Sequence, residues 1–174
     1  MIEKYSRYRI LKEFFNFPAK KFHMREISRL TEISQPSVIN HLTALLKDKL
    51  ILKEKTGIYP TYCSNRENGL FKIYKKIDLM LRMHETGFID FVYDSAVPDS
   101  IILFGSASKG EDAEESDIDL FVQSPEKKLK LDKYEKLLKR QISIFFEENF
   151  SKLSKELKNN LVNGILIKGY LKAF

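Results

Sequence analysis

The spacing of apolar residues changes at about residue 99, and this change limits the folds that the chain can adopt. Before it, apolar residues recur at helical spacing, with two short β-rich runs at 50–55 and 58–64 joined by Thr56-Gly57. After it, we expect strands at 101–104, 118–123, 141–146 and 165–171, with helices within 126–139 and at 149–160. Alternating strands and helices predict an α/β part with a mixed sheet, and the chain as a whole is expected to be α+β.

The charge of the chain is unevenly distributed over three predicted parts: residues 1–65, a connector helix within 66–98, and residues 99–174. Residues 1–65 carry 12 Lys and Arg against 6 Asp and Glu, which accounts for the whole net charge of +6. A basic part attached to a neutral remainder favours a polyanionic partner for residues 1–65.

Several classes of protein are excluded by what the sequence lacks. One cysteine, Cys63, permits no internal disulfide or thiolate zinc site, and His23, His41 and His84 are too far apart in sequence to suggest a metal cluster. No apolar run is long enough for a membrane span, and Met1–Ile10 is charged rather than signal-like. We therefore expect a cytoplasmic protein without a membrane partner.

The first third predicts three helices and a hairpin. Helices are expected at 2–16, 25–31 and 34–49, the last with Ser34 as its N-cap residue and Pro36 in its first turn. Their packing residues are apolar and helically spaced: Ile27, Leu30, Ile33, Val38, Leu42 and Leu45. This order resembles a winged helix-turn-helix, and the segment 24–51 resembles regulators of the MarR and ArsR kind.

The third of these helices begins with polar side chains suited to the edges of DNA bases. Candidate base-reading residues are Gln35, Ser37, Asn40 and His41, of which His41 taken alone fits a polar surface residue better. Candidate phosphate contacts at the helix end and hairpin are Lys47, Lys49, Lys53 and Lys55. The alternative is a winged fold used only for dimerisation or protein docking, with the lysines as a solvated face.

Two aspartates and a Gly-Ser turn carry the clearest chemical signal. The strand 101–104 leads into Gly105-Ser106, and ten residues later Asp117 and Asp119 occupy alternate positions of another apolar strand. Alternate positions project from one face of a strand, where two carboxylates suit a hard cation such as Mg²⁺. The glycine permits close approach of a phosphate to the backbone. The alternative is an acidic surface loop followed by an ordinary strand.

This pattern resembles the minimal nucleotidyltransferases of the DNA polymerase beta superfamily over about residues 99–171. The resemblance implies that Gly105 and Ser106 hold the triphosphate of an NTP, with ATP the expected substrate. It implies that Asp117 and Asp119 are the catalytic carboxylates and bind Mg²⁺ or Mn²⁺. Two further nucleotide contacts are implied at Ser116 and at Lys109, where these proteins often have arginine.

One departure from the family pattern concerns a third carboxylate on the next strand. The face shared with the aspartates should carry Gln141, Ser143 and Phe145, and Ser143 stands at the equivalent position. A site without this acid is expected to bind a nucleotide and one Mg²⁺ better than it catalyses.

Two other groups of residues have a simpler structural interpretation. The basic stretch 127–140 is expected to be a solvated helix face, with a docking surface for RNA or an acidic partner as the alternative. Tyr134, Leu137 and Leu138 are expected in the core, as are the phenylalanines at positions 14, 15, 17, 145 and 146.

Two functional hypotheses follow. The first is a Mg²⁺-dependent nucleotidyltransferase that moves a nucleoside monophosphate to a protein or RNA hydroxyl, bound to DNA through residues 1–65. Because minimal nucleotidyltransferases also act as antitoxins, the first hypothesis includes a toxin or an RNA as a partner of the chain. The second is a non-catalytic DNA-binding regulator that senses a nucleotide. Homodimerisation through the 66–91 helix is expected in either case.

Overall fold

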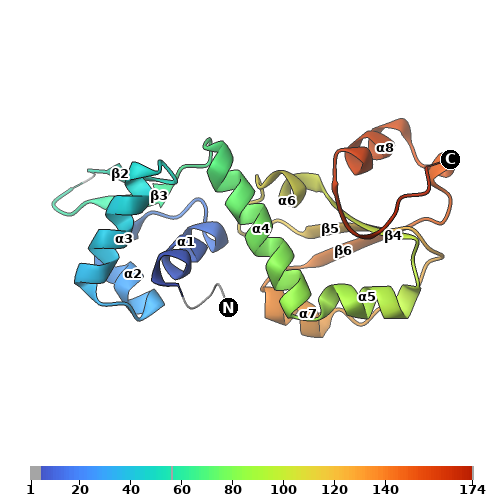
Figure 1. Ribbon diagram of the computed structural model, residues 1–174, viewed down its shortest axis with the longest axis horizontal. Helices are drawn as coiled ribbons and strands as arrows, with labels where there is room; N and C mark the ends of the chain where they lie inside the picture. The colour runs from blue at the N-terminus through green and yellow to red at the C-terminus, as the bar shows by residue number, and fades with distance from the viewer. Residues whose placement is uncertain (1–4, 56, 174) are drawn as a thin grey trace. The chain divides into compact units, whose positions relative to one another are not determined.

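The computed structural model describes residues 5–55 and 57–173, arranged in two compact units, Met1–Lys75 and Lys76–Phe174 (Figure 1). The division falls within a single helix, α4 (Gly69–Glu85). Residues 2–4 of the predicted first helix and Thr56 of the predicted turn lie outside the described residues. Each unit is described below by itself.

The first unit contains the predicted three helices and hairpin. Its elements are α1 (Ser6–Asn16), β1 (Phe22–His23), α2 (Met24–Thr31), α3 (Gln35–Lys47), β2 (Ile51–Glu54) and β3 (Thr61–Ser64). The strands form an antiparallel sheet in the order β1-β3-β2, with Phe22 opposite Tyr62 and Ile51 opposite Ser64. The second strand of the hairpin begins later than predicted because Pro60 has no N–H group for the ladder.

The core of the first unit joins α1, α2 and α3. Ile10, Phe14, Ile27, Val38 and Leu42 are fully or almost fully buried. Leu30, predicted to pack with Ile27, is instead half exposed. It is separated from Ile27 by three positions and points to the edge of the apolar stripe, where helix α2 meets solvent.

The predicted single connector helix is wrong, because two helices occupy this part of the chain. Helix α4 ends at Glu85, and α5 (Phe88–Ala96) follows after Thr86-Gly87. Gly87 has φ +72°, a left-handed conformation that interrupts helical hydrogen bonding and that glycine adopts at little cost. The helical spacing continues across this break, so the pattern alone did not reveal it.

The second unit is built on the mixed sheet that the sequence predicts. Its further elements are β4 (Ser100–Phe104), α6 (Gly105–Lys109), β5 (Ile118–Val122), α7 (Asp132–Leu138), β6 (Ile142–Phe146), the short 3₁₀ helix η2 (Phe150–Lys152), α8 (Lys155–Val162) and β7 (Ile165–Gly169). The strand order is β6-β5-β4-β7, with β5 and β6 parallel and the other pairs antiparallel. The predicted helix 149–160 is divided by Ser154, whose side chain caps α8.

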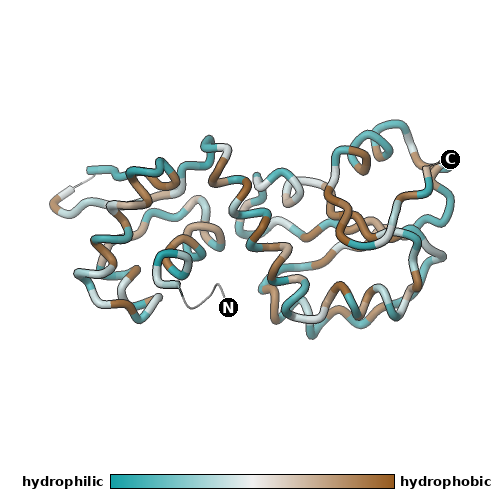
Figure 2. Tube along the Cα trace, in the orientation of Figure 1, coloured by the Kyte–Doolittle hydropathy of each residue, from teal (hydrophilic) through white to brown (hydrophobic). Residues whose placement is uncertain are grey.

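The two faces of this sheet have different surroundings. One face packs against α5, α7 and the end of α4, through residues such as Leu120, Ile89 and Leu138. The other face packs against η2 and α8 through Ile102 and Phe121. In Figure 1, α8 lies on one side of the strands and α5 and α7 on the other, and Figure 2 shows apolar residues concentrated along the strands. Alternation along β5 therefore leaves Asp119 on the α8 side.

Four apolar residues depart from the predicted core. Leu137 and Phe145 are 51% and 43% exposed, and Phe17 and Phe146 are only partly buried, whereas Tyr134 and Leu138 are buried as predicted. Phe145 lies on the edge strand β6, where no further strand covers it. No helix among the described residues is long and apolar enough to cross a membrane.

Candidate functional site

The Asp119 carboxylate packs directly against the Gly105 backbone. The antiparallel pairing of β4 and β5 sets Phe104, the last residue of β4, opposite Asp119. The chain then turns into α6 at Gly105, which has φ +69°. A Cβ atom added at Gly105 would overlap the Asp119 Oδ2 atom and lie 3.3 Å from its Cγ atom. Only glycine therefore permits both this turn and this position of the carboxylate.

Replacing Gly105 with alanine is expected to displace the Asp119 carboxylate and to lower the free energy of unfolding by about 1–3 kcal/mol. Urea denaturation followed by circular dichroism would measure the loss, and calorimetry would measure NTP binding with Mg²⁺. Gly87→Ala is the matched control, since Gly87 has φ +72° and no atom within 4 Å of an added Cβ. If both variants bind NTP equally well, the contact between Gly105 and Asp119 has no role in binding.

Asp117 and Asp119 repel one another electrostatically. Asp117 is exposed just before β5, and Asp119 is partly buried on it. Burial raises the pKa of Asp119 above its usual range, the negative charge of Asp117 raises this pKa further, and Arg140 opposes the rise. A divalent cation that binds both carboxylates offsets the repulsion between their negative charges.

Arg140 holds the loop that leads to Asp117. Its Nη1 atom lies 2.6 Å from Asp112 Oδ2, and the two side chains are 11% and 5% exposed. Its Nε donates to the Ser116 carbonyl at 2.7 Å, and its Nη2 donates to the Asp117 carbonyl at 2.9 Å. The prediction of a solvated basic face is therefore wrong at Arg140, because this guanidinium is buried against the loop. Sequence spacing gave no signal for the ion pair.

Ser143 lies beside Asp119 on the neighbouring strand. The parallel register of β5 and β6 pairs Asp119 with Ser143 and Phe121 with Phe145. Ser143 and Phe145 are exposed, whereas Ile142 is buried on the opposite face of the strand. Serine thus occupies the position next to Asp119 at which the family pattern has a third carboxylate.

The other predicted nucleotide contacts are Ser106, Lys109 and Ser116. Ser106 is partly buried in α6, and Lys109 is exposed at its last position. The Ser116 hydroxyl accepts a hydrogen bond from the Ala113 N–H at 2.8 Å, so it closes the loop before Asp117. These three residues remain candidates, and Ser116 has a structural role in addition.

The predicted DNA-contacting residues lie at the surface of the first unit. Ser37, Asn40, His41 and Lys47 share one side of α3 by their spacing, whereas Gln35 lies one turn before Ile39 on another side. Gln35, Asn40 and Lys47 are exposed, and Ser37 and His41 are partly exposed. Lys53 on β2 and Lys49 and Lys55 in the adjoining loops are also exposed.

The residues present fit one divalent cation better than two. Mg²⁺ is usually bound in proteins by one or two carboxylates, with water and phosphate oxygens as its other ligands, and Asp117 and Asp119 are two such carboxylates. Among residues 5–55 and 57–173, no group of three or more His, Cys, Asp or Glu side chains is placed to hold a metal ion. Any cation bound at Asp117 and Asp119 would therefore depend on the nucleotide for further ligands.

One family model matches the part of the chain that holds the candidate site. No curated protein and no solved structure matches the chain. Residues 87–167 match the family model of the nucleotidyltransferase domain, a range that includes the Gly105 turn, both aspartates and Ser143. The match supports a nucleotidyltransferase domain in the second half of the chain, with nucleoside monophosphate transfer as its general activity.

Proposed function

We propose that this protein is a cytoplasmic, Mg²⁺-dependent nucleotidyltransferase that moves a nucleoside monophosphate from an NTP to a hydroxyl group of a protein or an RNA. The observation that carries the proposal is the Asp119 carboxylate packed on Gly105, next to Asp117, within the residues that match the nucleotidyltransferase domain. The glycine turn and the paired carboxylates supply a phosphate-binding backbone and a cation site in one place.

Each residue has a role in this reaction. Gly105 and Ser106 bind the triphosphate, with Lys109 and Ser116 as further contacts, and ATP is the expected substrate. A divalent cation, Mg²⁺ or Mn²⁺, supplies charge neutralisation when bound at Asp117 and Asp119. The acceptor oxygen bonds to the α-phosphorus, the bond to the β-phosphate oxygen breaks, and pyrophosphate leaves. The acceptor proton passes to a solvent water molecule, because a bound cation leaves neither aspartate available as a base.

A second candidate function is a nucleotide-sensing regulator without catalysis. It is favoured by one observation, the serine at position 143 in register with Asp119. In this case the same residues bind the nucleotide, and the hydroxyl of Ser143 does not replace the missing third carboxylate in activating an acceptor.

The first unit is proposed to be a winged helix-turn-helix that binds DNA. Support comes from the order of its elements, from the exposed polar side of α3 and from the concentration of positive charge in residues 1–65. Ser37, Asn40 and His41 would contact bases, as would Gln35, which is the first residue of α3 and lies on another side of the helix. The lysines at positions 47, 53 and 55 would contact phosphates.

Replacing Gln35 and Asn40 with alanine is expected to reduce sequence discrimination by about 1–3 kcal/mol for each base contact that is lost. Non-specific affinity should change little, because the lysines are retained. Binding to a selected site and to random duplex, measured at fixed salt concentration, would separate the two effects. An equal loss on both DNAs would contradict base reading by this pair.

A homodimer through α4 is also proposed. Leu70, Ile73 and Tyr74, all in the first unit, are spaced so that they form one apolar stripe, and each is 44–53% exposed. A second copy would bury this stripe, and a two-fold dimer suits a symmetric DNA site. Mass photometry with purified protein would detect the homodimer.

In the antitoxin form of the hypothesis, the chain also binds a toxin protein.

The direct test is to incubate the purified chain with Mg²⁺ and each α-³²P-labelled NTP, with and without cell lysate. Transfer of label by the unmodified chain, and its loss in EDTA, would establish the enzyme. Nucleotide binding without transfer under any condition would favour the sensor. Absence of both binding and transfer would contradict both functions.

Replacing Ser143 with aspartate is expected to raise Mg²⁺ affinity in the presence of NTP by about tenfold, because a third carboxylate joins the pair. Ser143→Asn is the control of equal size without charge. Calorimetric titration with Mg²⁺ at saturating NTP would measure the change. Equal affinity in the aspartate and asparagine variants would show that position 143 does not face the cation.

A further inference from the structure

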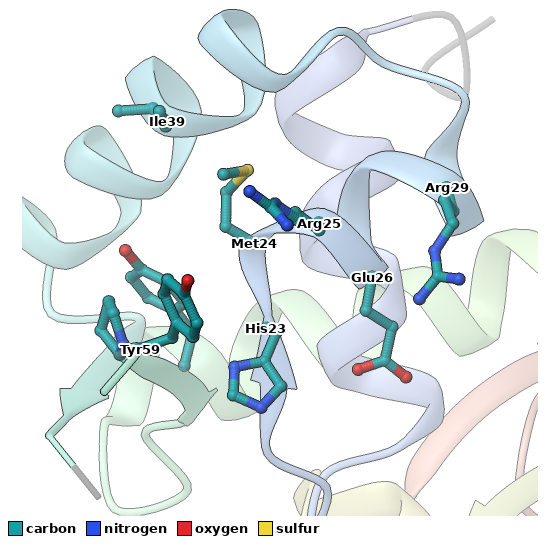
Figure 3. Close-up of a pocket in the computed structure, with 9 residues that line it drawn as sticks. His23, Met24, Arg25, Glu26, Arg29, Ile39 and Tyr59 are labelled. Atoms are coloured by element: carbon teal, nitrogen blue, oxygen red, sulfur yellow. The ribbon is translucent and has the colours of Figure 1, made fainter. Parts of the chain in front are cut away.

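A cavity of about 530 Å³ lies within the first unit, between α2, α3 and the β2–β3 hairpin. Figure 3 shows Met24 and Arg25 between Ile39 of α3 and Tyr59 of the hairpin, with Arg29 farther along α2. The volume falls within the range of sites for small organic molecules, about 300–1,000 Å³. None of the residues proposed above to contact DNA or the transferred nucleotide lines this cavity.

The walls of the cavity combine apolar groups with aromatic rings. Met24 and Ile39 contribute apolar side chains, and Tyr59 and Tyr62 contribute rings from the hairpin. Tyr59 is 65% exposed and Ile39 is 49% exposed, although both are large and apolar for most of their surface. An aromatic ligand inserted here would cover both side chains and could stack on a tyrosine ring.

The charge of the cavity is positive. Arg25 and Arg29 lie one helical turn apart on α2, about 6 Å along its axis, and both are exposed. Glu26, the one acidic side chain in the lining, is bound to Lys20 at 2.8 Å, and this contact lowers the Glu26 pKa. The negative charge of Glu26 is therefore neutralised by Lys20, which does not line the cavity. Figure 3 shows the Arg25 guanidinium pointing toward Met24 and the Arg29 guanidinium pointing toward Glu26. Both are long, exposed side chains one turn apart, so they can turn toward one another and bind the oxygens of a single phosphate.

We propose that this cavity binds a nucleoside monophosphate, with the phosphate between Arg25 and Arg29 and the base against Tyr59. The apolar and aromatic walls distinguish it from a surface that only follows a nucleic-acid backbone, since backbone contacts require charge but no apolar cavity. The ligand would touch Ile39 and so contact α3, the helix proposed to read DNA. This is a second nucleotide site, separate from Gly105 and Asp119, and it does not depend on catalysis.

The test uses the full chain with Asp117→Asn and Asp119→Asn, so that the transferase site contributes no cation-dependent binding. Calorimetric titrations in EDTA with AMP, GMP, CMP and UMP are expected to give one-to-one binding with a Kd below about 1 mM for at least one of them. Arg25→Ala with Arg29→Ala, and separately Tyr59→Ala, should each weaken that binding at least about tenfold. Arg66→Ala, an exposed arginine outside the cavity, is the matched control and should have no effect.

Several outcomes would overturn the proposal. They are the absence of binding at millimolar nucleotide, equal binding in the cavity variants, and binding of inorganic phosphate as tight as that of the nucleotide. Loss of duplex DNA binding in the arginine variant without any nucleotide binding would also overturn it, and would assign these arginines to DNA instead. Thermal melting of each variant would confirm folding, which we expect because Arg25, Arg29, Tyr59 and Arg66 are exposed and asparagine keeps the shape of each aspartate.

Discussion

Replacing Arg140 with methionine is expected to lower the free energy of unfolding of the second unit by about 3–5 kcal/mol. The guanidinium faces the buried Asp112 carboxylate and also donates to the carbonyls of Ser116 and Asp117. Its removal leaves the Asp112 charge buried without this cation, and the loop before β5 loses two hydrogen bonds. Denaturation in urea, followed by far-ultraviolet circular dichroism, would measure the loss.

The double variant Arg140→Met with Asp112→Asn separates the ion pair from the loop contacts. If the buried charge causes most of the loss, the double variant should recover part of the stability, with a coupling energy of about 0.5–3 kcal/mol. Lys139→Met, at an exposed neighbouring position, is the control for removing one positive charge. A loss below 1 kcal/mol in Arg140→Met would contradict the assigned role of this ion pair, by comparison with the roughly 0–1 kcal/mol of a surface pair.

The same substitution should affect the candidate site, since Arg140 fixes the backbone at Asp117. Its positive charge also lowers the pKa of Asp119, against the effects of burial and of Asp117. The variant is therefore expected to protonate Asp119 at higher pH than the unmodified chain does. A titration of the Asp119 carboxyl by nuclear magnetic resonance would detect this change.

The sequence predicted the parts of this site that follow from short-range periodicity. Alternation over Ile118, Asp119 and Leu120 correctly placed the carboxylate on the face opposite two buried side chains. The same rule indicated Ser143 as its neighbour, and the strand register confirms this pairing. The mixed sheet was likewise predictable, because each strand and helix has its own apolar pattern.

Other features depend on contacts between distant residues or on single backbone angles. The partners Arg140 and Asp112 are 28 positions apart, and a basic stretch gives no indication of which side chain turns inward. The break at Gly87 arises from one left-handed residue within continuous helical spacing. The cavity beside Arg25 needs α2, α3 and the hairpin together, so no single segment could predict it.

Replacing Asp117 and Asp119 with asparagine is expected to lower Mg²⁺-dependent nucleotidyl transfer by at least about 100-fold, since charge stabilisation at a reacting phosphate is worth at least this much. Asparagine keeps the shape of each side chain and the contact with Gly105, so folding should be retained. Transfer of label from α-³²P-NTP would measure activity. Glu114→Gln with Glu115→Gln, two exposed acids of the same loop, removes an equal charge and should leave transfer unchanged.

The asparagine variant should also change how stability depends on pH. Because the pKa of Asp119 is raised by burial and by Asp117, the folded chain binds this proton more tightly than the unfolded chain does. Asp119 therefore stabilises the folded chain at low pH. This contribution to stability is lost as the pH rises, first through the usual carboxyl pKa of the unfolded chain and then through the raised pKa of the folded chain. The variant lacks this loss, so its melting temperature should exceed that of the unmodified chain by a margin that grows as the pH rises above about 4.

Mg²⁺ should reverse this difference in the unmodified chain, because a cation that binds only the folded state stabilises it. At neutral pH we expect Mg²⁺ with NTP to raise the melting temperature of the unmodified chain and of the glutamine control, but not of the asparagine variant. The effect should fade as pH is lowered and Asp119 takes up its proton. A stabilisation by Mg²⁺ that is equal in all three proteins would place the cation elsewhere and contradict the assignment of this carboxylate pair.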